Sequence, residues 1–328
     1  MEPRLDATVL EDPRDFAALE EEWEDLYHDS KQATPFQSWA WLYSWWESYG
    51  EGYELRLVTL RNEKGLLVGL IPLILERRRG FGRLLFIGTG QTDYQDILAR
   101  EGWEGRVLDA GTGALKQLEG WQVADLQQLR PEAAAWGIFR RWGGYRTRVW
   151  QEGCPVIDVK PWDELVASLS KNHRSTVRRA LRRVEEDGVR RRLAGSEGAK
   201  QAARRLVALH RELWQGRDMA PEHSTRRWAS FIEAAASRMI DRERGEISEF
   251  WRDGEIIVTL FWVFGQNCVG FYHSGASREA LERYQWNSLL ICTGIETARD
   301  RDDTCLDLLR GEEPYKLRWA SRVVPNYQ

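Results

Sequence analysis

Apolar residues in the first 50 positions recur every three or four residues, which is the spacing of one face of a helix. The series consists of Phe16, Leu19, Trp23, Leu26 and Tyr27. Asp12 and Pro13 precede it and suit an N-cap and a first helical residue. A second, Trp-rich helix is predicted to begin at Ser38 and to end at Gly50.

The pattern then changes to that of strands. Residues 53–60 and 66–75 are predicted to form a hairpin, because turn residues separate two apolar runs. A third strand is expected near residues 84–87 or, alternatively, near 94–98. Mixed helix and strand are expected from there to about residue 150.

The second half shows a clearer alternation of helices and strands. Helices are predicted over residues 165–187, 199–214, 226–241 and 278–301, and strands over 246–252, 255–264, 268–274 and 304–309. Asp253-Gly254 between two of these strands is a strong hairpin signal. The order hairpin, strand, helix, strand appears here and more faintly in the first half. We therefore predict an α/β (α+β) fold of two modules, residues 1–155 and 156–328, each a mixed sheet flanked by helices.

Composition narrows the possible functions. A chain of 328 residues suits two domains, and a net charge of −4 argues against a general nucleic-acid binder. The four cysteines lie far apart, so neither a zinc site nor a disulfide framework is expected, and reduced thiols fit a cytoplasmic protein. No signal peptide is seen, and the longest apolar stretch, residues 65–75, is too short to span a membrane.

Four segments carry a family resemblance. They are PFQSWAW at residues 35–41 with the tryptophans and glycine that follow, the acidic loop at 92–96, the basic helix at 171–187, and DLLRGEEPYKLRW at 307–319. Together they resemble the GNAT-like acyltransferases of the cellulose-biosynthesis-associated type. That family is similar in fold to the Fem-type aminoacyl transferases, which also carry two GNAT-like modules. The resemblance implies an acyltransferase with two tandem GNAT-like modules, acting on a small-molecule or cell-envelope amine.

The acyl donor is left open between acyl-CoA, as a co-substrate, and aminoacyl-tRNA. Acetyl-CoA-binding GNAT modules hold the pyrophosphate on a Gly-rich turn between a strand and a helix. The corresponding residues here, 283–288, read RYQWNS and contain no glycine. Asn287 or Ser288 could still cap the helix, but Trp286 is bulky where a phosphate must approach the backbone. This departure favours the tRNA alternative.

Acyl transfer to an amine needs a base, oxyanion donors and an acid, but no covalent enzyme intermediate. His273 is the candidate base, on the strand that runs beside the donor in GNAT modules. Strict alternation would place its side chain on the face opposite Tyr272. Asp307 is a candidate acid/base paired with Lys316 or Arg310. The alternatives are a structural histidine and a structural salt bridge.

The remaining candidates concern binding. Tyr315 is a candidate proton donor, with packing as the alternative. The expected donor-binding residues are Arg174, Arg178, Arg182, Asn287, Ser288 and Lys316, and the expected acceptor-binding residues are Trp39, Trp41, Asp93, Tyr94 and Tyr272. The three arginines recur every four residues beside an apolar stripe and suit contact with phosphate groups. The alternative is that they belong to an ordinary solvent-exposed helix face without a ligand. No metal is expected, and a binding protein without catalysis is a further alternative.

Overall fold

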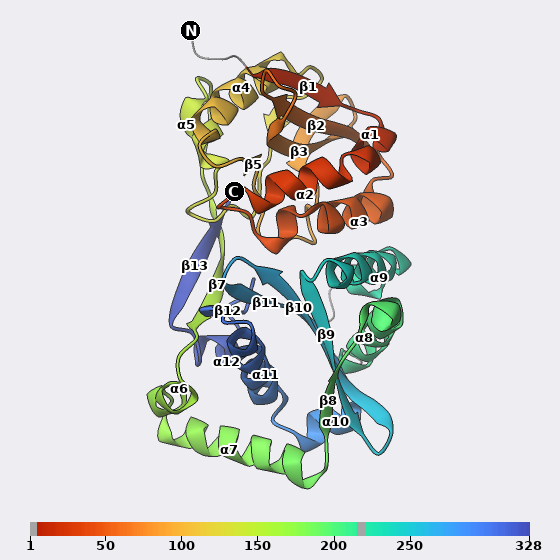
Figure 1. Cartoon of the computed structure of the whole chain (residues 1–328), viewed down its shortest axis with the longest axis vertical. Helices are drawn as coiled ribbons and strands as arrows, with labels where there is room; N and C mark the ends of the chain where they lie inside the picture. The colour runs from red at the N-terminus through yellow and green to blue at the C-terminus, as the bar shows by residue number, and fades with distance from the viewer. Residues whose placement is uncertain (1–4, 215–220) are drawn as a thin grey trace. The chain divides into compact units, whose positions relative to one another are not determined.

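The computed structural model of the chain describes residues 5–214 and 221–328. The chain divides into two compact units (Figure 1). Unit 1 consists of Met1–Glu152 together with Val324–Gln328, and unit 2 is Gly153–Val323. Each unit is built on its own mixed sheet, so the predicted fold class is confirmed.

The sheet of unit 1 is mostly antiparallel. Its order is β1 (Asp6–Leu10), β2 (Tyr53–Arg61), β3 (Leu67–Arg78), β4 (Phe81–Phe86) and β6 (Val123–Ala124), and β5 (Leu98–Ala99) also pairs with β3. The pairing of β4 with β6 is parallel. The sequence predicted a third strand near residues 84–87 or near 94–98. The structure has a strand close to each position, β4 and β5, and both pair with the long, buried β3.

Helices flank this sheet. They are α1 (Pro13–Ala18), α2 (Glu20–His28), α3 (Trp39–Tyr49), α4 (Glu104–Gln117) and α5 (Trp136–Arg141), with a short helix η1 (Pro35–Gln37). The predicted first helix is divided into two at Leu19. Asp12 caps α1 and Ser38 caps α3 through their side chains, as the sequence predicted.

Residues 324–328 complete unit 1, although they are far from the rest of it in sequence. The Asn326 side chain is fully buried and donates hydrogen bonds of 2.8 Å to the Asp93 carbonyl and to Gln128 Oε1. Tyr327 exchanges backbone hydrogen bonds with Leu129. The N-terminal unit thus depends on chain that follows the whole of unit 2.

The sheet of unit 2 is mostly antiparallel. Its order is β13 (Arg322–Tyr327), β7 (Trp150–Asp158), β12 (Cys305–Asp307), β11 (Cys268–Ala276), β10 (Glu255–Gly265), β9 (Gly245–Arg252) and β8 (Arg190–Leu193). β11 and β12 are parallel. The hairpin of β9 and β10 turns at Asp253-Gly254, where both residues have positive φ, as predicted.

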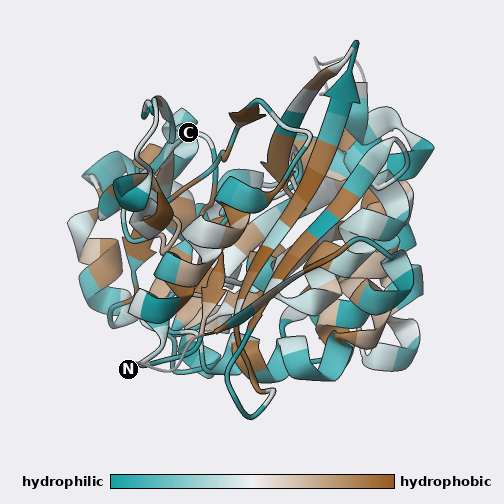
Figure 2. Cartoon of the chain, turned by 90° about the horizontal axis from the view of Figure 1, so that it is seen from above, coloured by the Kyte–Doolittle hydropathy of each residue, from teal (hydrophilic) through white to brown (hydrophobic). Residues whose placement is uncertain are grey.

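Helices cover both faces of this sheet. They are α6 (Trp162–Ser168), α7 (Lys171–Glu186), α8 (Ala199–Leu213), α9 (Arg226–Asp241), α10 (Arg278–Arg283), α11 (Trp286–Asp300) and α12 (Pro314–Leu317), with short helices η2 (Ser196–Gly198) and η3 (Pro221–Ser224). α8 and α9 lie on one face, and α11 with α7 lies on the other (Figure 1). Figure 2, which colours the whole chain by hydropathy, shows largely hydrophobic strands and helices that carry both hydrophobic and hydrophilic residues.

Two predicted helices of unit 2 are interrupted. Residues 165–187 form α6 and α7, because Leu169 and Ser170 are extended and the Ser170 side chain caps α7. Residues 278–301 form α10 and α11, with a break at Tyr284 and Gln285. Among the described residues, no helix is both long enough and apolar enough to cross a bilayer.

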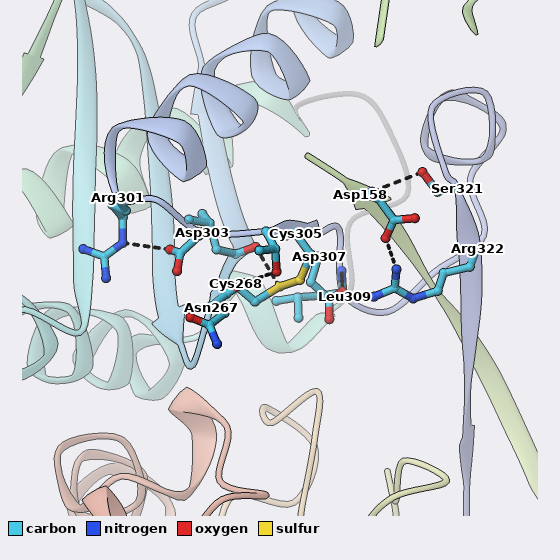
Figure 3. Close-up of a disulfide and its surroundings, with 12 residues drawn as sticks. Asp158, Asn267, Cys268, Arg301, Asp303, Cys305, Asp307, Leu309, Ser321 and Arg322 are labelled. Carbon is cyan, nitrogen blue, oxygen red and sulfur yellow. Dashed lines mark hydrogen bonds and ion pairs between the residues drawn. A yellow bond between two sulfur atoms is a disulfide. The ribbon is translucent and has the colours of Figure 1, made fainter. Parts of the chain in front are cut away.

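The expectation of four reduced cysteines is wrong. Cys268 and Cys305 form a disulfide, with their Cα atoms 4.7 Å apart (Figure 3). They face each other because β11 and β12 pair in parallel at these two residues. The distance of 37 residues along the chain concealed this register. Cys154 and Cys292 are buried and lie outside this disulfide.

Candidate functional site

The first feature of the site is the point where β11 and β12 part. The two strands pair over three positions, which end with Gly270 opposite Asp307. β12 ends there, whereas β11 continues to Ala276. Within residues 5–214 and 221–328, no strand pairs with that edge of β11 past Gly270. Ligands of α/β proteins commonly bind where neighbouring strands separate at one end of a sheet.

A β-bulge changes the direction of the side chains at this point. Phe261 lies opposite His273 and Trp262 lies opposite Phe271, so Tyr272 is an extra residue in β11. Phe271 packs against Trp262, whereas the rings of Tyr272 and His273 contact each other at 4.5 Å. The prediction that alternation separates Tyr272 from His273 is therefore wrong.

His273 belongs to a cluster of three histidines on the α8 and α9 face of the sheet. His210 comes from α8 and His223 from η3, and one ring nitrogen of each of the three lies within 4.8 Å of the others. The ring of Trp228 on α9 packs against all three, at 5.0, 4.8 and 5.4 Å. His210 is buried, and the other two are partly buried.

Burial is the main influence on the protonation of these rings, because it disfavours the charged form. It lowers the pKa of His210 to about 4, although a hydrogen bond to the Ser274 carbonyl acts in the opposite direction. Burial also lowers the pKa of His223, and it lowers the pKa of His273 well below its usual value. All three rings are therefore neutral at pH 7.

Sequence reasoning missed His210 and His223. The chain has five histidines, and these three lie between positions 210 and 273 on separate elements. Their concentration in that stretch was the one available signal. No short-range spacing connects them, since a helix, a 3-10 turn and a strand bring them together.

The C-terminal motif turns back toward the end of β12. Asp307 Oδ1 accepts a hydrogen bond of 2.8 Å from the Leu309 N–H, and Leu309 has a φ of 57° (Figure 3). The side chain of Lys316, which is buried, donates to the Arg310 carbonyl at 2.6 Å and pairs with Glu313 at 3.0 Å. Lys316 thus forms an ion pair with Glu313. The sequence had suggested Lys316 or Arg310 as the partner of Asp307.

Tyr315 is partly buried and packs against the core of unit 2. Burial, reinforced by the negative charge of Glu313, raises the pKa of its hydroxyl. The hydroxyl is therefore protonated across the physiological range of pH and is a hydrogen-bond donor. Packing and proton donation, the two alternatives for this residue, are both compatible with this placement.

The arginines of α7 do not share one environment. Arg178 and Arg182 are exposed and make no ion pair with described residues, whereas Val177 and Ala180 are buried beneath the helix. Arg174 instead turns inward. Its Nη1 donates to the carbonyls of Ala167 and Leu169, both at 2.8 Å, and so it satisfies the end of α6. The prediction of one solvated row of three arginines is wrong for Arg174.

The start of α11 differs from the predicted cap. Gln285 occupies the N-cap position without a side-chain hydrogen bond, and the helix begins at Trp286, which is buried. Asn287 is exposed and Ser288 is buried, and both lie inside the helix. Neither of them caps it. The bulky indole therefore occupies the first turn, where acetyl-CoA-binding modules place glycine.

The predicted acceptor-binding residues of the first half lie in the core of unit 1. Trp39 is 4% exposed and Trp41 is fully buried, and Trp41 Nε1 donates to Thr92 Oγ1 at 2.9 Å. Asp93 and Tyr94 are also buried. In this structure, these side chains pack the unit and present almost no surface to a ligand.

The comparison with protein families concerns unit 2. Residues 171–317 match the family described as an acetyltransferase (GNAT) domain. Unit 2 is therefore similar to a GNAT-type domain. The matched segment contains α7 through α12, and with them the histidine cluster, the parting of β11 from β12 and the C-terminal motif up to Leu317. The match supports an acyltransferase.

Solved structures resemble the whole chain in fold. The crystal structure of FemX aligns with a TM-score of 0.66 at 13% identity, over 94% of this chain and 95% of that one. L-PGS from Bacillus licheniformis aligns with a TM-score of 0.60 at 11% identity, over 94% and 90%. A tandem GNAT protein from the clavulanic acid biosynthesis pathway aligns with a TM-score of 0.51 at 13% identity, over 99% and 98%. No curated protein matches the sequence significantly.

Proposed function

We propose that the GNAT-type domain of unit 2 is an N-acyltransferase that moves an acyl group from acyl-CoA to an amine. The observation that carries the proposal is the parting of β11 from β12 past Gly270, inside the matched segment. No described strand pairs with this edge of β11. An extended acyl donor can therefore lie along it and form hydrogen bonds with the backbone N–H and C=O groups of the strand. A small-molecule or cell-envelope amine is the acceptor that the sequence resemblance implies.

The reaction places simple demands on the protein. The amine nitrogen attacks the thioester carbonyl, the carbon–sulfur bond breaks, a proton leaves the nitrogen, and the thiolate of CoA takes up a proton. Backbone N–H groups along the edge of β11 suit the developing oxyanion. The Tyr315 hydroxyl, whose pKa is raised by burial, suits protonation of the leaving group. No covalent intermediate with the chain is required.

Phosphate binding is assigned to the exposed face of α7. Arg178 and Arg182 lie one turn apart there, and Arg179 is exposed beside them. Guanidinium groups without a carboxylate partner among the described residues suit the phosphates of CoA. Arg174 is left out of this assignment, because its Nη1 already donates to two carbonyls at the end of α6.

Titration calorimetry with acetyl-CoA tests the assignment. Reversing Arg178 and Arg182 to Glu should weaken binding at least about tenfold, which corresponds to about 1.4 kcal/mol. The matched control reverses Arg226 and Arg299, which are exposed on other helices of the same unit. Equal affinity in both double variants would contradict the proposed phosphate site. Tyr315→Phe should lower kcat while leaving acetyl-CoA affinity unchanged.

One observation favours a second donor, aminoacyl-tRNA. Trp286 fills the first turn of α11, and no glycine is present there. A pyrophosphate has little room to approach the backbone at such a turn. Under this alternative, the arginines of α7 contact tRNA phosphates. Native mass spectrometry of the freshly purified protein distinguishes co-purified CoA from RNA, and tRNA binding would weaken steeply with salt. Binding of either ligand without turnover would indicate a non-catalytic binding protein.

A further inference from the structure

Three imidazoles converge in unit 2 without an acidic partner in their group. His210, His223 and His273 each offer one nitrogen, and these nitrogens lie within 4.8 Å of one another. Neutral imidazole is the commonest side-chain ligand of transition metals in proteins. We propose that this cluster is a binding site for a divalent transition-metal ion such as Zn²⁺. The proposal rests on the three rings alone and does not depend on acyl transfer.

The tautomer of His210 is fixed by its surroundings. His210 Nδ1 lies 2.7 Å from the Ser274 carbonyl oxygen, which can only accept a hydrogen bond. Nδ1 therefore carries the proton, and Nε2 presents its lone pair. Metal-binding histidines usually donate their second N–H to a carbonyl or carboxylate in this way, which orients the ring and increases its basicity. His210 thus already has the outer-shell partner of a metal ligand.

The spacing of the nitrogens also suits an ion. His210 Nε2 and His223 Nδ1 are 3.2 Å apart. Two nitrogens bound to zinc at about 2.0–2.1 Å with tetrahedral angles lie about 3.3–3.4 Å apart. In the absence of an ion, the same pair is held by a hydrogen bond from His223 Nδ1–H to His210 Nε2. Binding replaces this hydrogen bond and brings the nitrogen of His273, which lies within 4.8 Å of the other two, to about 3.3–3.4 Å from each of them.

The environment supports both entry and retention of an ion. His223 and His273 are partly exposed, so an ion can reach the cluster from solvent. Trp228 is fully buried, and its indole packs beside all three rings, which limits how far they can rotate apart.

Nearby cations set the character of the site. Arg310 lowers the pKa of His223 and His273 electrostatically, Lys316 does the same for His273, and Arg211 for His210. These charges weaken the affinity for a cation. They also favour an anionic fourth ligand, such as hydroxide or a carboxylate, in the position that three protein ligands leave open. We therefore expect one ion per chain with an exchangeable fourth ligand.

Zinc titration of the full chain after treatment with a chelator tests the site. Isothermal calorimetry should show one Zn²⁺ per chain, and bound Zn²⁺ should raise Tm because it binds the folded state. Loss of a residue that only supports a metal ligand weakens metal binding by roughly 10–100-fold. His223→Ala removes a proposed ligand itself and should weaken Zn²⁺ binding by more than that. His223 lies on a short, partly exposed turn, so this variant is expected to fold. His28→Ala, on an exposed residue of unit 1, is the control and should bind as the unaltered chain does.

His273→Ala provides a second measurement on another element. Circular dichroism of each variant confirms that it is folded before titration. Stoichiometric binding that is lost in both His223→Ala and His273→Ala, but retained in His28→Ala, supports the site. Absence of stoichiometric binding to the unaltered chain, or binding that survives both substitutions, overturns it.

Discussion

Cys268 lies directly opposite Cys305 in the parallel pair of β11 and β12, and a disulfide joins them (Figure 3). The bond fixes the two strands at the end where they pair. Past Gly270 the strands are no longer paired, so the proposed donor site begins two residues beyond a covalent connection. The connection spans 37 residues, which include all of α10 and α11.

Replacing both cysteines by alanine should lower the free energy of unfolding of unit 2 by about 2–4 kcal/mol, because the loop closed by the disulfide gains freedom in the unfolded chain. Denaturant unfolding of the oxidised proteins measures the difference. A reductant should destabilise the unaltered chain and leave the double variant unchanged. Equal stability of the two oxidised proteins would show that the bond contributes nothing.

Arg174 and Arg178 should respond differently to alanine, although they are one turn apart on α7. Arg174→Ala leaves the carbonyls of Ala167 and Leu169 without this donor and should cost about 1–3 kcal/mol. Arg178→Ala should change stability by less than about 0.5 kcal/mol, since the side chain is exposed. Thermal unfolding of the two variants checks the contrast. Similar losses in both would contradict the inward orientation of Arg174.

Asp187, just after α7, should make stability depend on pH in the acid range. Its carboxylate accepts hydrogen bonds from Arg283 at 2.6 Å and from the Tyr284 hydroxyl at 2.8 Å. The bond from Arg283 is the main cause that lowers the pKa of Asp187 below its usual value. A lowered pKa in the folded state contributes stability above the unfolded pKa of about 3.9, and that contribution is lost as the pH falls below it.

The test compares the chain with Asp187→Asn in urea at several pH values. The unaltered chain should have the higher midpoint near pH 7, and the gap should narrow as the pH falls below about 4. Asp241→Asn, at an exposed residue that ends α9, should show no such trend. A gap that widened toward acid would contradict the sign of the shift.

Gly275 allows the close approach of β11 to α8. A Cβ atom at this position would lie 2.6 Å from the backbone nitrogen of His210 and 2.8 Å from the backbone carbonyl oxygen of Leu206. Gly275→Ala should therefore push the helix away and destabilise unit 2 by about 1–3 kcal/mol. Gly198→Ala meets nothing within 4 Å and should be nearly neutral. Thermal unfolding of both variants tests the close packing, and equal Tm values would argue against it.

Features set by neighbouring residues could be predicted from the sequence. The turn at Asp253-Gly254 and the caps at Asp12 and Ser38 depend on a few adjacent positions, and the structure confirms all three. The alternation of helices and strands likewise predicted the fold class, because burial on one face imposes its own periodicity on each element.

Features set by pairing across the sheet could not be predicted. The facing of Cys268 and Cys305 depends on the register of two strands separated by a pair of helices. The histidine cluster depends on how α8 and η3 meet β11, and the bulge at Tyr272 interrupts the alternation of side chains along this strand. In each case the deciding contact joins residues that no local pattern connects.

The participation of residues 324–328 in unit 1 has a consequence for synthesis on the ribosome. The buried Asn326 and its bonds to Asp93 and Gln128 form only after all of unit 2 has been translated. Domains usually fold in the order in which they emerge. Here the N-terminal unit lacks residues 324–328 of its core during the synthesis of unit 2. Neither unit can therefore reach its final structure before the last residues of the chain emerge.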